Sequence, residues 1–236
     1  MMLWYKAWLE TRSRFLIALL GMTSLGAWRT WELNQMVPAW TYAPYYYFNF
    51  RAVHDLLNLM LVVAITLLFM GGLLQERATG LSLFTLGLPV SRARLMSARI
   101  TVGLLESAAL VAIPWTAICI TGILTSPVRP VSLALFYAMV TAAGGALIAG
   151  ISLLASSLIE GAYTAPMVVV GVWLLSANAP KSWAAAFPFE LMGGRANLDR
   201  SNMVTGPWPW GHAAAFLAAA AALIWISVKI IERKDF

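Results

Sequence analysis

Six apolar runs, separated by polar or proline-rich segments, constrain this chain more than any other feature of its sequence. A helix rises about 1.5 Å per residue, so crossing a bilayer core of about 30 Å takes roughly 20 apolar residues. The strictly apolar part of the first run ends at Trp28, and we expect its helix to continue past Arg29 to reach that length. The pattern predicts six membrane-spanning helices, at residues 15–34, 56–74, 98–124, 131–159, 162–177 and 213–231.

The composition excludes a soluble fold. Of the 236 residues, 61% are hydrophobic and 11% are charged, which leaves too little polar surface to cover a soluble domain. The single cysteine, Cys119, lies inside an apolar run, so neither a disulfide framework nor a cysteine-based metal site is available. We therefore expect an all-α polytopic membrane protein that forms one domain over residues 1–236, with no metal site.

The distribution of basic residues predicts the orientation in the membrane. With six spans, both termini and the loop between the second and third spans share one side. That side would carry ten of the sixteen basic residues: Lys6, Arg12, Arg14, Arg77, Arg92, Arg94, Arg99, Lys229, Arg233 and Lys234. Cytoplasmic loops carry an excess of Lys and Arg, so we expect both termini to be cytoplasmic.

The loop between the second and third spans, residues 71–99 (GGLLQERATGLSLFTLGLPVSRARLMSAR), concentrates charge, glycine and proline in a chain that has little of any. A short helix with one apolar side is predicted because three large apolar residues recur at i, i+3 and i+7: Leu81, Phe84 and Leu88. Pro89 disfavours a helical conformation for the residue before it. Ser91 is a good N-cap for a new helix that opens at Arg92.

This loop resembles the coupling segment of a known family. The pattern E-R-x-x-G, a hydrophobic segment and L-P-V-S-R is similar to the loop between the second and third spans of ABC-2-type transport permeases, which have the type V exporter-like fold. The matching positions are Glu76, Arg77, Gly80, Leu88, Pro89, Val90, Ser91 and Arg92. In that family the loop is a coupling helix that contacts the ATPase subunit. The resemblance implies that these residues, with Leu81 and Phe84, couple the chain to an ATPase.

The first fourteen residues have the pattern of an amphipathic helix in the membrane interface. One face carries four apolar residues, and another carries polar residues spaced by four: Leu3, Trp4, Ala7 and Trp8 on the first, and Lys6, Glu10 and Arg14 on the second. Tryptophan at the headgroup level is typical of such helices. A positively charged lead-in to the first span is the alternative. The family resemblance favours the interfacial helix.

Two loops are expected outside the cell. Residues 36–50 cluster aromatic side chains, which an aromatic belt at the outer interface explains more simply than a cargo site. Residues 178–212 are interrupted by proline and glycine and predict short external helices before the last span, as in the family. His54 and His212 lie in or beside these loops, and we interpret each as an interfacial polar residue.

Glu106 is the charged residue to single out within the spans. It lies seven residues after Arg99, and therefore about 10 Å into the membrane, where an ionisable group faces protein or water. It is either a pathway or gating carboxylate, a partner of Arg99, or a group in a water-filled vestibule. Further along the same span, Pro114 should kink the helix.

The fourth expected span carries a row of small residues at intervals of four: Ala142, Ala146 and Gly150. Small residues at this spacing let helix backbones approach closely. Tight packing within the chain and an interface between subunits both use such rows, and the sequence does not separate them.

The sequence has no motif for chemistry of its own. It lacks G-x-x-x-x-G-K-[ST], H-E-x-x-H and G-x-S-x-G, so no catalytic residue is predicted and the chain is not expected to be an enzyme by itself. ATP and Mg²⁺ would bind in a separate ATPase subunit. No nucleic-acid partner is expected.

The resemblance implies a function and a set of partners. The chain would be the permease subunit of an ATP-binding-cassette exporter in a bacterial or archaeal plasma (inner) membrane. It would pair with a second permease chain, expected to be identical, and with the ATPase. An amphipathic cargo is favoured: a lipid, a lipid-linked glycan, a peptide or a drug. The alternative is a membrane scaffold or accessory subunit of an envelope complex that transports nothing.

Overall fold

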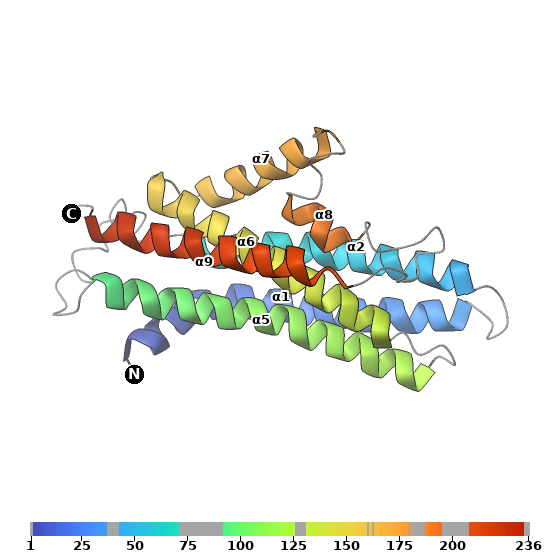
Figure 1. The fold of residues 1–236 in the computed structure, drawn as a ribbon. Coiled ribbons are helices and arrows are strands. Elements are labelled where there is room, and N and C mark those ends of the chain that lie inside the picture. Colours follow the sequence, from blue (N-terminus) through green and yellow to red (C-terminus); the bar gives the residue numbers. More distant parts are fainter. Residues whose placement is uncertain are drawn as a thin grey trace.

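The computed structural model describes residues 2–36, 43–70, 92–125, 131–159, 161, 163–178, 180, 187–194 and 208–233. These residues form helices and no strand (Figure 1). In chain order the helices are α1 (Met2–Met36), α2 (Ala43–Leu68), α5 (Arg92–Thr125), α6 (Val131–Leu158), α7 (Thr164–Asn178), α8 (Pro188–Gly193) and α9 (Trp210–Arg233).

Four helices of the described part are long and apolar enough to cross a membrane: Phe50–Leu68 of α2, Arg94–Thr125 of α5, α6 and α9. Their length and composition indicate a multi-pass membrane protein whose described part is helical. The two other expected spans, in α1 and α7, differ from these four. The Thr164–Ser176 stretch of α7 is apolar but short, and α1 is long but carries more charge. The structure thus bears out the helical membrane class, while the count of six spans stays a prediction.

Several boundaries differ from those expected. The predicted elements 1–14 and 15–34 form one helix, α1, because no proline interrupts the sequence between them. The second helix begins at Ala43 rather than near residue 56, so part of the aromatic segment expected as a loop is helical. Arg92, where a helix start is predicted, is the first described residue of α5, and the proposed cap at Ser91 lies outside the described residues. α5 continues through Pro114 to Thr125.

α6 is the central helix. In the apolar stretch of α6 that is long enough to cross a membrane, 67% is buried inside the protein. The corresponding share for α9 is 22%, so most of the α9 surface is available to lipid. A helix that is hydrophobic on all sides is suited to such a central position. α2, α5, α7, α8 and α9 all pack against α6.

Two glycines of α6, Gly145 and Gly150, serve packing within the chain, whereas Ala142 of the predicted row is exposed. A Cβ atom at Gly145 would lie 3.1 Å from Ile65 Cδ1 of α2, and one at Gly150 would lie 3.2 Å from the Ala220 carbonyl oxygen of α9. Both helices approach as closely as they do because these positions carry no side chain. Of the two interpretations left open by the sequence, this geometry supports intrachain packing at Gly150.

α1 lies alongside α5 for much of its length and also contacts α2 (Figure 1). The N-terminal turns of α1 thereby reach two helix ends, the last turn of α2 and the first turns of α5. Both ends flank the segment in which the family resemblance places the coupling helix.

Candidate functional site

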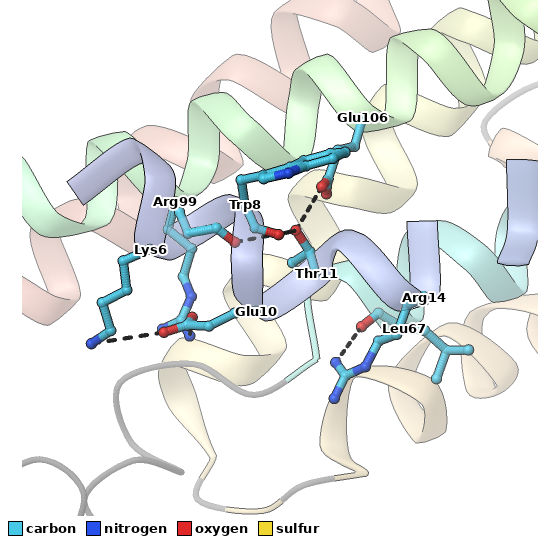
Figure 2. Close-up of polar contacts among 9 residues, drawn as sticks. Lys6, Trp8, Glu10, Thr11, Arg14, Leu67, Arg99 and Glu106 are labelled. Carbon is cyan, nitrogen blue, oxygen red and sulfur yellow. Dashed lines mark hydrogen bonds and ion pairs between the residues drawn. The ribbon is translucent and has the colours of Figure 1, made fainter. Parts of the chain in front are cut away.

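The predicted coupling residues lie mostly outside the described part of the chain. Glu76, Arg77, Gly80, Leu81, Phe84, Leu88, Pro89, Val90 and Ser91 are not described, and Arg92 is described only as the first residue of α5. What the structure does describe is the set of contacts at the two helix ends that flank this segment. We call this set the α1 junction and define it as Lys6, Glu10, Thr11, Arg14, Leu67, Arg99 and Glu106 (Figure 2).

The first part of the α1 junction is a three-residue charge cluster. Arg99 of α5 donates a hydrogen bond to Glu10 of α1, and Lys6 Nζ lies 3.7 Å from the same carboxylate. The side chains of Lys6, Glu10 and Arg99 are 39%, 32% and 24% exposed. Partly exposed pairs of this kind contribute about 0–1 kcal/mol each because water and salt screen the charges. The cluster therefore sets the alignment of α1 on α5 more than it adds stability.

The second part is buried and links the same two helices. Thr11 Oγ1 donates a hydrogen bond of 2.6 Å to Glu106 Oε1, and the two residues are only 7% and 3% exposed. Ala7 and Phe15, four residues either side of Thr11, are buried on the same face of α1. This face packs on α5, which is why a threonine of α1 can meet a glutamate 95 positions away.

Glu106 keeps one oxygen without a partner. Its Oε2 atom is buried and has no hydrogen-bond partner among the described residues. An unpaired carboxyl oxygen in a membrane-spanning helix is expensive, which makes Glu106 a candidate functional residue. The hydrogen-bond partner that the structure gives Glu106 is Thr11, and Arg99, considered as its partner from the sequence, donates to Glu10. At 3% exposure Glu106 faces protein rather than an open vestibule.

The third part joins α1 to the end of α2. Arg14 Nη1 donates a hydrogen bond of 3.0 Å to the Leu67 carbonyl oxygen, in the last turn of α2. The final carbonyl groups of a helix have no partner inside the helix, and cations are favourable there. Arg14 therefore caps α2 from another helix, one turn after Glu10 and Thr11 engage α5.

The sequence located some of these residues but not their partners. Lys6, Glu10 and Arg14 were assigned to one polar face, and Glu106 was singled out. The polar face of α1 contacts α2 and α5 rather than water or headgroups alone. Only the packing of α1 in the structure reveals this. The predicted apolar face is buried only in part. Ala7 is buried, and the ring of Trp8 packs edge to face on that of Phe15 with 5.5 Å between the ring centroids. Trp4 is exposed.

The two histidines differ from each other. His212 is exposed at the start of α9, as an interfacial residue would be. His54, also interpreted as interfacial, is fully buried, which corrects that interpretation. The reason is the early start of α2 at Ala43, which places His54 about three turns into the helix, where the helix packs on α6.

Comparison with known proteins adds no family assignment. No family model matches the sequence, and no curated protein is significantly similar to it. The features that bear on function are therefore the sequence pattern of residues 76–92 and the geometry of the α1 junction on either side of it.

Proposed function

We propose that this chain is the membrane-spanning permease subunit of an ATP-binding-cassette exporter. Six spans would place both termini in the cytoplasm of a bacterial or archaeal plasma membrane. Two chains would pair, and a separate ATPase subunit would bind ATP and Mg²⁺ and dock on the segment that contains residues 76–92. The cargo would be amphipathic: a lipid-like molecule, a peptide or a drug.

The α1 junction is the observation that carries this proposal. A coupling segment transmits force only if the helices attached to it respond together. Here the helix that precedes the segment is held to α1 through Arg14, and the helix that follows it is held through Glu10 and Thr11. A displacement of the segment would therefore move α1, α2 and α5 as one group, which is the behaviour expected of a permease driven from its cytoplasmic side.

The lengths of α1 and α7 are compatible with six spans. The 35 residues of α1 extend over roughly 52 Å, enough for an interfacial part and a full crossing. The 15 residues of α7 extend over roughly 22 Å, which is short of the bilayer core. A short helix of this kind is accommodated by local thinning of the bilayer, and α7 would be the fifth span in that way.

Purification from the native host tests the proposal. A tagged chain should bring down a P-loop ATPase in equal copies, as measured by mass spectrometry and quantitative gel analysis. Cross-linking before solubilisation would retain a weakly held subunit. A chain that purifies without any such ATPase under both conditions is not a permease of this class, and the scaffold alternative would then stand.

A substitution locates the docking surface. Phe84→Asp should lose the ATPase on purification, because burying an unpaired carboxylate in an interface costs several kcal/mol. Ser82→Asp introduces the same charge on a different predicted face and should retain most of the ATPase. Full retention and normal ATP turnover in Phe84→Asp would show that residues 76–92 are not the coupling element.

A further inference from the structure

The end of α2 marks one boundary of the hydrocarbon core on the neighbouring helix α1. The apolar stretch Phe50–Leu68 of α2 has 19 residues and is roughly 28 Å long, so it can cross the core once. Its last turn contacts Arg14 of α1 through the Leu67 carbonyl oxygen (Figure 2). The turn of α1 that precedes Arg14 thus lies just outside the hydrocarbon, in the layer of the lipid headgroups.

A second contact of α1 agrees with this level. Asn34 donates a hydrogen bond to Thr125, the last residue of α5. At about 1.5 Å per residue, the stretch of α1 from Arg14 to Asn34 is roughly 30 Å long, which matches the thickness of the core. The two contacts of α1 with the ends of other helices are therefore one core thickness apart.

Arg12, in the turn before Arg14, differs from the other basic residues of this region. It is exposed, and it has neither a hydrogen-bond partner nor an ion-pair partner among the described residues. Lys6 and Arg99 both contact Glu10, and Arg14 caps α2. Arg12 is therefore a cation at the level of the headgroups that the described part of the protein leaves uncompensated.

Arg12 lies within a row of exposed, mostly apolar side chains. Tyr5, Leu9, Arg12 and Leu16 follow one another at i, i+4, i+7 and i+11, the spacing of one side of a helix, and all four are exposed. Leu20, one turn further, is 68% exposed. One end of the row thus lies at the headgroups and the other extends into the core, with an unpaired cation between them.

We propose that this side of α1 binds an anionic phospholipid. The Arg12 guanidinium donates parallel hydrogen bonds to the phosphate oxygens of the headgroup, a geometry that suits arginine. The acyl chains lie against Leu16 and Leu20, and the ring of Tyr5 lies among the headgroups, as interfacial tyrosines do. A zwitterionic phospholipid carries an ammonium group that competes for its own phosphate, so the site prefers a lipid without one.

A second copy of the chain fits this side of α1 less well. Two copies in one membrane are related by a two-fold axis along the membrane normal, which brings residues of equal depth together. The two Arg12 side chains would then face each other in a partly apolar interface, where like charges repel. A lipid phosphate supplies the opposite charge at the same depth.

Photochemical labelling of the full-length chain in phosphatidylcholine vesicles tests the proposal. A trace of phosphatidylglycerol with a diazirine in its acyl chain is activated by light, and labelled peptides are quantified by mass spectrometry. Trypsin releases peptide 15–29, which contains Leu16 and Leu20, and peptide 201–229, which contains most of α9. Because most of the α9 surface is available to lipid, the ratio of the two labels corrects for random encounters with lipid.

Matched variants show whether Arg12 is responsible. Arg12→Gln should lower the ratio about fivefold, the change expected for one cation at an anionic surface. Arg12→Lys keeps the charge and should retain most of the label. Ser13→Gln, at the exposed neighbouring position, should leave the ratio unchanged. Arg233→Gln removes the same charge from the exposed end of α9 and should not lower it. Phosphatidylcholine with the same diazirine should give a smaller ratio in the wild-type chain.

Four results would overturn the proposal. The first two are equal ratios for wild type and Arg12→Gln, and equal ratios for the two lipids. The third is competition by free glycerol phosphate as strong as that by unlabelled phosphatidylglycerol, which would mean that only the phosphate is recognised. The fourth is efficient disulfide formation between copies through Leu16→Cys in a Cys119→Ala background, which would place a second copy on this side. No ATPase is involved, so the outcome is independent of whether the chain proves to be a permease.

Discussion

The α1 junction and the α8 network both connect helices through polar side chains, yet they do so by different physics. The charge cluster of the α1 junction is partly exposed, and its pairs can exchange partners with water. The α8 network consists of His54 and Asn58 of α2, Thr141 of α6 and the Met192 carbonyl group of α8. His54 and Thr141 are buried and Asn58 is partly buried. Asn58 Nδ2 donates to the Met192 carbonyl oxygen at 3.0 Å and lies 2.9 Å from His54 Nε2. A partly exposed ion pair contributes about 0–1 kcal/mol, whereas a buried polar group that loses its partner costs about 1–3 kcal/mol. The network should therefore tolerate substitution much less well than the charge cluster.

The largest effect is expected at the centre of the α8 network. Asn58→Leu removes the donor to the Met192 carbonyl oxygen and the acceptor of the Thr141 hydroxyl, which keeps its 3.4 Å contact with His54 Nε2. The expected cost is about 2–3 kcal/mol in unfolding free energy. Thermal unfolding of the purified chain in micelles measures it. Leu59→Ala, at the exposed neighbouring residue of α2, is the control and should change little. Equal losses in the two variants would show that the network contributes nothing specific.

The fit of α8 at Gly144 should give the next largest effect. Gly144→Ala places a methyl group against Met192 and should destabilise the chain by about 1–3 kcal/mol through overpacking. Gly171→Ala makes the same change in α7, where nothing lies within 4 Å. Because glycine is unfavourable inside a helix, this control should be neutral or slightly stabilising. The same thermal assay compares them, and a neutral Gly144→Ala would contradict the close fit.

Two substitutions in the buried part of the α1 junction distinguish a structural role of Glu106 from a role in transport. Thr11→Val removes the partner of Glu106 and should cost about 1–3 kcal/mol. Glu106→Gln retains an acceptor for Thr11, so the yield of the complex should be unchanged. Cargo-stimulated ATP hydrolysis by the proposed permease–ATPase complex should nevertheless change in Glu106→Gln, because an NH₂ group replaces the unpaired carboxyl oxygen. Lower yield with unchanged hydrolysis would make Glu106 a purely structural residue.

The smallest effect is expected in the charge cluster. Arg99→Gln should reduce stability by about 1 kcal/mol or less, since the pair with Glu10 is partly exposed. Added salt should shrink the difference from wild type, because salt screens such pairs. Lys6→Gln, which removes the longer contact, should be milder still. A loss in Arg99→Gln as large as that in Asn58→Leu would remove the distinction between the two regions.

The sequence was sufficient for the features that depend on local pattern. Apolar runs of bilayer length predicted the long apolar helices of a membrane protein. The row of small residues in α6 predicted a close helix approach, which the structure assigns to α9 at Gly150. Each of these signals depends on residues within a few turns of one another, so no partner from elsewhere in the chain was needed.

The tertiary structure decided the rest, because the partners are far apart in sequence or are backbone atoms. Glu106 was recognised as unusual, but its partner is Thr11 rather than nearby Arg99, since α1 lies along α5. His54 looked interfacial beside an apolar run, but it is buried because α2 starts earlier and packs on α6. Asn58 binds the carbonyl group of a residue 134 positions later, and a carbonyl group is common to every residue. Such a contact cannot be predicted from the sequence, because it forms only when α8 packs on α2 and α6.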